Sequence, residues 1–234
     1  MAQVRTRDKP TADSADESYL SLPDAARLAL ITTSRLKRWI AIGAVTPSQQ
    51  IVTPDRETIA SGFTLADVGY LHLLRHLTHD GSVPFDHAVR LLAHFIARFG
   101  PPGPKWHEAV VGRGGPGHPR VVAYAPDEYL ATLPIPGKEG AGQRYLAVLG
   151  SLIPDGVTLE SLLIPVEFLP YVEINPRKEG GQPVVRGTRI RTEVVRAVVA
   201  KYGLRAVTED YYPHIPEDSI GPVIRFENYL DMAA

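Results

Sequence analysis

One stretch near the C-terminus of this chain of 234 residues, from Ile174 to Ile190, constrains the fold more than any other. It reads Ile-Asn-Pro-Arg-Lys-Glu-Gly-Gly-Gln-Pro-Val-Val-Arg-Gly-Thr-Arg-Ile. The pattern predicts a tight β-hairpin in which residues 171–174 pair with residues 183–185, and Gly180 and Gly181 lie near the reversal. The hairpin is expected to lead directly into a helix.

Two residues mark the expected entry to that helix. Gly187 is expected at a positive φ or at a close backbone approach, and Thr188 is a candidate cap. Because valine is a mediocre helix former, the valine-rich face of this helix must be buried to hold its shape. The apolar residues that recur at helical spacing on this face are Val194, Val195, Val198, Val199 and Tyr202.

The Gly-Thr-Arg-Ile core and the later segment Glu209-Asp210-Tyr211-Tyr212-Pro213-His214-Ile215 together resemble a small family of bacterial antitoxin domains, long catalogued as a domain of unknown function. The resemblance covers about residues 172 to 231 and implies a hairpin followed by a three-helix, helix-turn-helix-like unit. Members are often encoded beside PIN-like ribonuclease toxins, in the manner of VapB antitoxins with VapC toxins. Arg191 stands where the family often has proline, which changes the entry to the helix.

Composition narrows the class of protein. The absence of cysteine excludes disulfides, thiolate metal sites and cysteine nucleophiles, and it fits a reducing cytoplasm. A hydrophobic share of 44% suits a packed globular protein, and a net charge of -1 says nothing by itself about nucleic acid. No apolar run approaches the roughly 18 residues that span a bilayer. Residues 1–18 lack the apolar core of a secretory signal and are expected to form a disordered tail.

Residues 19–62 predict a compact helical unit with a β-wing. The segment Ser21-Leu22-Pro23-Asp24 is a good helix start, because it combines a serine cap, a proline in the first turn and an acid at the third position. The first helix is predicted over residues 22–28. A second helix, capped by Thr32 or Thr33, is predicted to about residue 41, and residues 45–58 suit a small β-wing.

The following segment predicts two more helices. One begins at a capping box formed by Thr64 and Asp67 and runs to about His79, and the other runs from Pro84 to Phe99. With the preceding unit, this pattern is similar to MerR-type winged helices over roughly residues 19–100. It departs from the full regulators of that type, since the chain has no long terminal dimerisation coil and no cysteine-based sensor.

The second predicted helix offers a candidate DNA-binding face. If Leu36, Trp39 and Ile40 point inward, the opposite face carries hydroxyls and basic side chains that suit the major groove. Arg35 and Arg38 are predicted to touch DNA, and the alternative is an ordinary solvated polar surface. The candidate residues are Thr33, Ser34, Arg35, Lys37 and Arg38.

The central region, residues 101–170, is expected to be a β-containing linker. Strands are predicted at residues 109–111 and 120–124 around a glycine-rich loop at 112–117, which lacks the ending of a phosphate-binding loop. A short helix is expected at residues 144–150, and strand-like pieces are expected around residues 158–164.

No catalytic or cofactor site is predicted. The sequence has neither a Gly-x-Ser-x-Gly elbow nor a His-Glu-x-x-His motif, so we expect no enzyme. His72, His76 and His79 recur at a spacing that can hold a metal, but they fall on the polar side of their helix, so we expect neither a metal nor a cofactor there.

The C-terminal motif turns carry a second candidate surface. Tyrosine and arginine are favoured at interface hot spots, and arginines facing the acidic active site of a PIN-like toxin would suit an inhibitor. The same residues could equally bind another subunit or pack within the domain itself. The candidates are Arg186, Arg189, Arg191, Tyr211, Tyr212 and His214.

The expected fold is mainly α with small β elements (α+β). It comprises a tail (1–18), a MerR-like winged helix-turn-helix domain (19–100), a central β region (101–170) and a hairpin plus three-helix antitoxin domain (171–234). The sequence predicts a cytoplasmic, homodimeric antitoxin that neutralises a PIN-like toxin and represses its own double-stranded DNA operator. The alternatives are a stand-alone transcriptional regulator that senses a small ligand and a toxin-binding scaffold without a DNA role.

Overall fold

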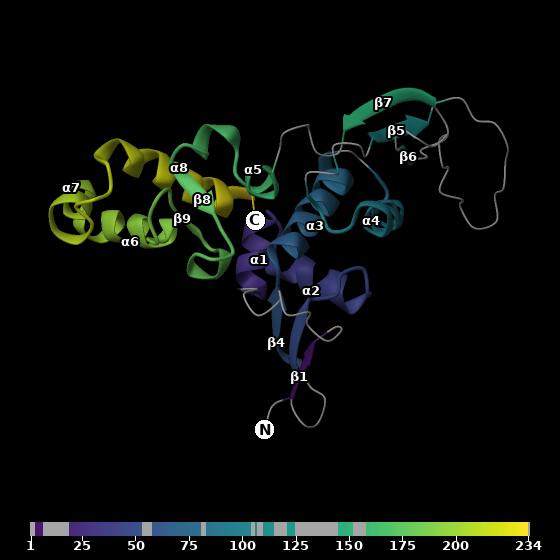
Figure 1. The fold of residues 1–234 in the computed structure, drawn as a ribbon, viewed down its shortest axis with the longest axis horizontal. Helices are drawn as coiled ribbons and strands as arrows, with labels where there is room; N and C mark the ends of the chain where they lie inside the picture. The colour runs from purple at the N-terminus through teal and green to yellow at the C-terminus, as the bar shows by residue number, and fades with distance from the viewer. Residues whose placement is uncertain are drawn as a thin grey trace. The chain divides into compact units, whose positions relative to one another are not determined.

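The computed structural model describes residues 3–6, 19–52, 58–80, 83–103, 106, 110–114, 121–124, 145–151 and 158–233. Over these residues the chain is mainly helical with small antiparallel sheets, which confirms the expected α+β class (Figure 1). The chain divides into two compact units. The first unit joins residues 1–68 with residues 163–234, and the second unit comprises residues 69–162.

The first unit opens with two short helices, α1 (Leu22–Leu28) and α2 (Thr33–Ala41). The cap predicted for α1 is confirmed, because the Ser21 hydroxyl accepts a hydrogen bond from the Asp24 amide at 3.3 Å. Thr32 caps α2, and its Oγ1 accepts from the Arg35 amide at 3.1 Å. The turn between the helices is tight enough to hold the buried Leu30 at a φ of 57°, a conformation that a side chain of this size rarely adopts.

A small sheet accompanies these helices, with strand order β1-β3-β4-β2. Strands β3 (Gln49–Val52) and β4 (Thr58–Phe63) pair antiparallel, and β2 (Leu20–Ser21) pairs with β4. Strand β3 lies inside the expected β-wing at residues 45–58, whereas β4 lies almost entirely beyond it. The expectation of a disordered tail is wrong for β1 (Gln3–Thr6), which pairs antiparallel with β3. An unpaired strand edge leaves backbone groups free to bind a further strand, and distant residues of the same chain supply it. Residues 7–18 of the expected tail lie outside the described residues.

The C-terminal part of the first unit contains the predicted hairpin. Strands β8 (Val172–Ile174) and β9 (Pro183–Val185) pair antiparallel, and the 3₁₀ turn η5 (Glu179–Gly181) lies between them. Gly180 and Gly181 take φ values of 67° and 83° there, which glycine adopts without strain. A Cβ on Gly181 would lie 3.6 Å from Leu65, so this turn packs directly on the N-terminal part of the unit.

The helices of this part follow the hairpin (Figure 1). They are α6 (Thr192–Tyr202), the short α7 (Leu204–Ala206) that continues into the π-helical turn η6 (Val207–Tyr211), and α8 (Glu217–Ala233). The 3₁₀ turn η4 (Val166–Phe168) precedes the hairpin, and Phe168 packs edge-on against Phe226 of α8 at a centroid distance of 5.6 Å.

The expected buried face of α6 is only partly buried. Val195 is fully buried, whereas Val194, Val198 and Val199 are half-buried. The expectation is wrong for Tyr202, whose surface is 51% exposed. Helical spacing places these residues on one side of α6, but it does not determine how far the neighbouring elements extend along that side.

The second unit contains α4 (Phe85–Phe99) and a sheet of order β6-β5-β7. Helix α3 (Leu65–Arg75) begins in the first unit and continues into the π-helical turn η2 (His76–Asp80) of the second. Its predicted capping box is confirmed, since the amides of Thr64 and Asp67 each donate to the other's side chain. Trp106 is fully buried beside Phe95 at a centroid distance of 5.6 Å.

Two expectations for the central region are wrong. The segment expected to be a short helix is strand β7 (Tyr145–Ser151), which pairs with β5 (Val110–Gly114), while β6 (Val121–Tyr124) pairs with the other edge of β5. A seven-residue helix is marginal alone, whereas pairing with a strand satisfies its backbone. The strand expected around residue 160 is helix α5 (Leu159–Leu163). Thr158 and Ser161 cap it reciprocally, at 2.8 and 3.2 Å.

Candidate nucleic-acid and partner interfaces

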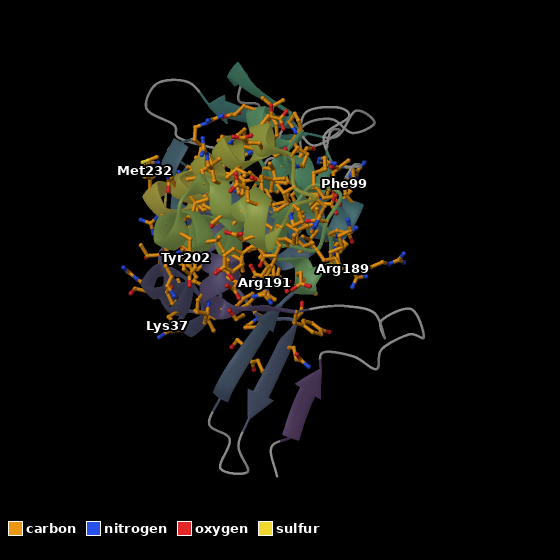
Figure 2. All side chains as sticks on the ribbon, turned by 90° about the vertical axis from the view of Figure 1, so that its left-hand side faces the viewer. Lys37, Phe99, Arg189, Arg191, Tyr202 and Met232 are labelled. Carbon is orange, nitrogen blue, oxygen red and sulfur yellow. The ribbon has the colours of Figure 1, made fainter. Side chains whose placement is uncertain are left out.

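Helix α2 presents the hydroxyl and basic side chains that the sequence singled out. Leu36 is fully buried and Trp39 is 6% exposed, so these two residues anchor the helix to its unit. Ser34, Arg35, Lys37 and Arg38 are exposed, and Thr33 is half-exposed. Figure 2 shows Lys37 at the edge of the ribbon with its side chain directed outward.

The electrostatics of this face favour a negatively charged partner. Helix α2 contains no acidic residue, and none of its three basic side chains forms an ion pair with a described residue. The N-terminus of a helix also carries partial positive charge from its unpaired amides. A phosphate near Thr33 or Ser34 would meet that charge together with two hydroxyls.

The three arginines of the C-terminal motif have different roles. Arg186 is engaged within its own domain, because its guanidinium donates to the carbonyl of Leu169 and, at 3.0 Å, to the carbonyl of Val172. Arg191 is also engaged, with its Nε 3.2 Å from Glu179 and its Nη1 3.5 Å from Glu193. Arg186 and Arg191 therefore serve the packing of the domain.

Arg189 differs from its neighbours. It is exposed and forms no hydrogen bond or ion pair with any described residue. In Figure 2 its side chain extends away from the ribbon, whereas Arg191 lies against the fold. Of the three predicted arginines, Arg189 alone leaves its guanidinium unpaired within the described part of the chain.

The turn that presents Arg189 is held firmly. Gly187 has a φ of 78°, as expected for this position, and its amide donates to Glu173 at 3.1 Å. Thr188 does not cap the helix as expected. Its hydroxyl donates to the Val185 carbonyl at 2.8 Å and accepts from the Ile190 amide at 3.0 Å, because these groups lie within the same turn.

Glu173 accepts the hydrogen bond that fixes this turn. Partial burial raises the pKa of its carboxyl, but the Lys178 ammonium, the Gly187 amide and the Arg186 guanidinium together outweigh that effect and hold the pKa below its ordinary value. Lys178 forms an ion pair with the same carboxylate. Glu173 is thus kept ionised as an acceptor for the turn.

The aromatic candidates form a second group. Tyr211 stacks on Tyr202 with a centroid distance of 5.3 Å and an interplanar angle of 26°. Tyr212 lies 6.3 Å from Tyr211 and 6.5 Å from His214, measured between ring centroids. The Lys201 ammonium lies 4.8 Å above the Tyr202 ring. Lys201 and Tyr211 lower the pKa of Tyr202, and the hydrogen bond to Tyr202 raises the pKa of Tyr211.

The two groups lie at opposite ends of α6. Arg191 precedes the first residue of this 11-residue helix, and Tyr202 is its last residue. At about 1.5 Å per residue, the helix separates them by roughly 16 Å. Figure 2 shows Tyr202 and Arg189 on different sides of the first unit. The structure therefore divides the predicted partner-binding residues into two groups. Arg186, Arg189 and Arg191 lie before α6 and form the arginine turn. Tyr211, Tyr212 and His214 follow its C-terminal end and, together with Tyr202, form the tyrosine surface.

A buried ion network that the sequence analysis missed joins α1 to α6 and α8. Glu227 of α8 is completely buried, and its carboxylate accepts from Arg27 of α1 and from Thr192 of α6, each at 2.6 Å. Arg196 of α6 lies 3.7 Å from it, and both arginines also bind Asp231. Glu227 and Asp231 are spaced i, i+4 on one helix face, but only the tertiary structure identifies their partners.

Charges in this network reinforce one another. Burial lowers the pKa of Arg27, but Glu227 and Asp231 outweigh burial and raise it. Burial likewise raises the pKa of Asp231, and the two arginines more than reverse that effect, leaving it lowered. Helix α1, which precedes the candidate DNA-binding helix α2, is therefore linked to the C-terminal helices α6 and α8 by paired charges within one compact unit.

The histidines of the α3 segment do not form a metal site. His72 lies in α3, whereas His76 and His79 lie in η2, where the widened helical turn changes their angular relation. Over the described ranges, no group of three or more histidine and carboxylate residues is arranged to hold a metal. None of the described helices has the length and apolar character needed to cross a membrane.

These features define an α+β protein with an exposed basic helix near its N-terminus and two exposed groups at the two ends of helix α6. Residues 172–226 match the family described as "Protein of unknown function (DUF433)". The chain also resembles the X-ray crystal structure of Rv2018 from Mycobacterium tuberculosis, with 16% identity, 88% of this chain and 96% of that chain covered, and a TM-score of 0.49. No curated protein matches the sequence significantly.

Proposed function

We propose that this protein is an antitoxin that binds and neutralises a PIN-like ribonuclease toxin and represses its own operon as a DNA-binding homodimer, without catalysis. The proposal rests on one observation: the basic helix and the region that matches the family belong to the same compact unit. The exposed, acid-free basic helix α2 lies in the same compact unit as residues 172–226, which match the DUF433 family, and the Arg27–Glu227 ion pair joins α1, the helix before α2, to α8. The resemblance of that domain to antitoxin domains supplies the toxin partner.

The DNA-binding half of the proposal assigns α2 to the major groove, with β3 and β4 as the wing. Arginine can bind the O6 and N7 atoms of guanine with two hydrogen bonds, and Lys37 can contact phosphate. Replacing Arg35 or Arg38 with alanine is expected to cost about 1–3 kcal/mol in specific binding. Arg177, also exposed, is the matched control outside α2, and Arg177→Ala should leave operator affinity unchanged.

Salt dependence tests the same assignment. If about six phosphates are neutralised per dimer, the logarithm of the binding constant should fall with the logarithm of salt concentration with a slope near -5. Two recognition helices spaced about 34–36 Å apart would read paired half-sites. A slope near zero, or unchanged affinity in both arginine variants, would contradict the use of α2.

The toxin-binding half assigns Arg189 as the first contact with an acidic active site. Guanidinium groups bind carboxylates with charge-assisted, often bidentate hydrogen bonds. The arginine turn presents Arg189 in a preorganised position, which lowers the entropy lost on binding. Arg186 and Arg191 are not assigned to the toxin, because their guanidinium groups already bind the Val172 carbonyl and the Glu179 carboxylate.

The deciding experiment is co-expression with the product of the adjacent gene, followed by pull-down and a ribonuclease assay. A stable complex with suppressed cleavage, weakened by Arg189→Ala, supports the proposal. A parallel gel-shift with the upstream DNA separates the alternatives. Operator binding without a complex would leave a stand-alone regulator, and a complex without operator binding would leave a toxin-binding scaffold.

A further inference from the structure

The tyrosine surface is an exposed apolar area at the C-terminal end of α6. Gly203, with a φ of 88°, ends the helix, and the chain turns through α7 and η6 so that Tyr211 returns onto Tyr202. Stacking covers only one face of each ring, so Tyr202 remains 51% exposed and Tyr211 remains 45% exposed. Leu204, 38% exposed, lies in the turn between them.

This concentration of exposed apolar side chains is unusual for the chain. Seven large hydrophobic residues are exposed among those described, and three of them are on this surface. Contiguous exposed apolar area marks interaction sites, whereas scattered single residues do not. Tyrosine is also enriched at interface hot spots.

The surface is held in place from beneath. Ala206 and Val207, between the two tyrosines in the sequence, and Ile215, just after them, are buried, and the Tyr212 amide donates to the Val207 carbonyl at 2.6 Å. Because the backbone is already ordered, little conformational entropy is lost when a partner binds.

Charges around the surface indicate the kind of partner. Lys201 and Arg205 lie before and within α7, and Glu209 and Asp210 lie in η6, all four of them exposed. Two positive and two negative side chains balance, so the rim does not favour a strongly acidic partner. A two-fold interface uses the same patch on both subunits and must be self-complementary, and a rim with equal numbers of positive and negative side chains permits such pairing.

We propose that Tyr202, Leu204 and Tyr211 form the contact between two copies of this chain, with Lys201 and Arg205 of each copy opposite Glu209 and Asp210 of the other. The proposal assigns a surface to the homodimer of the proposed function. It does not depend on DNA or toxin binding, since the mass of the protein alone tests it. The two exposed groups at the ends of α6 then have separate partners, the arginine turn the toxin and the tyrosine surface a second copy.

The experiment is sedimentation equilibrium of the full chain over a range of concentrations, without DNA or toxin. The wild type should reach twice the chain mass of 25.6 kDa. Truncating a hot-spot residue costs at least about 2 kcal/mol, so Tyr202→Ser with Tyr211→Ser should weaken dimerisation at least about 30-fold. Val166→Ser, which removes another exposed apolar side chain, is the control and should leave the dimer intact.

A charge exchange gives a second, independent test. A chain with Lys201→Glu and Arg205→Glu and a chain with Glu209→Lys and Asp210→Lys should each dimerise poorly alone and form a one-to-one heterodimer when mixed. Circular dichroism checks that each variant is folded. A monomeric wild type, a dimer that survives both the tyrosine and the charge changes, or a failure of the mixed variants to pair would overturn the proposal. So would tyrosine variants that lose toxin binding while remaining dimeric.

Discussion

Replacing Glu227 with alanine is expected to destabilise both the α1–α2 pair and the C-terminal helices, although only α8 carries the change. The wild-type carboxylate is fully buried and receives Arg27 and Thr192, each at 2.6 Å. Its removal leaves two arginines and a threonine hydroxyl without their shared acceptor. Buried charges that lose a partner are costly because water cannot replace the lost interaction.

The magnitude follows from burial. Removing one partner of a buried ion pair costs about 3–5 kcal/mol. The side chains of Arg27 and Arg196 are 23% and 32% exposed, and both retain Asp231, so the lower end of that range, about 3 kcal/mol, applies here. This is a large fraction of the roughly 5–15 kcal/mol by which a domain is stable.

Urea denaturation followed by circular dichroism measures the loss in free energy of unfolding. Peptide-resolved hydrogen exchange then locates it, and residues 22–41 should exchange faster together with residues 192–202. Glu193→Ala is the matched control, since its side chain is 49% exposed and its ion pair is long, so the change should stay within about 0.5 kcal/mol. A double-mutant cycle with Arg27→Ala should give a coupling free energy of about 1 kcal/mol or more.

Two results would refute the reasoning. One is a loss in Glu227→Ala no larger than that in Glu193→Ala. The other is faster exchange confined to α6 and α8, with α1 and α2 unaffected, because the network would then not join the two parts of the unit.

Three further changes test local features by urea titration. Arg191 has a φ of -62°, which proline also adopts, so Arg191→Pro should change stability by no more than about 1 kcal/mol, whereas a loss above 2 kcal/mol would refute this account of the helix entry. Gly187→Ala, at a φ of 78° with open space around its Cβ position, should cost about 1–2 kcal/mol from backbone strain alone, and an unchanged midpoint would contradict it. Asp231 and Glu173 have lowered pKa values, so their stabilisation is complete above about pH 5, where both carboxyls are ionised in the unfolded chain as well, and is lost as pH falls through their folded pKa values. Because the Asp231 side chain is exposed to solvent, its contribution to the free energy of unfolding is small, and high salt should reduce it further. A urea midpoint that rises as pH falls from 5 to 3 would refute the assignment.

Short-range interactions account for the parts of the fold that the sequence predicted. The caps at Ser21 and Thr64 and the glycines of the hairpin turn involve groups within three or four residues of one another. Such interactions depend on local spacing, so the residue types alone indicate them. The exposed face of α2 was predicted for the same reason, because Leu36 and Trp39 determine which side is buried.

Contacts between distant segments decided the rest. Strand β7 pairs with one edge of β5, β1 pairs with an edge of β3, and Tyr202 is exposed although Val195, seven residues before it on the same side of α6, is buried. The division of the arginines into engaged and unpaired groups depends on carbonyls and carboxylates up to 17 residues away. The Arg27–Glu227 pair spans 200 residues, so no local pattern announces it. The sequence by itself determined most of the helices, the C-terminal hairpin and the basic face, whereas the tertiary structure alone decided which side chains remain available to a partner, because that depends on what packs against them.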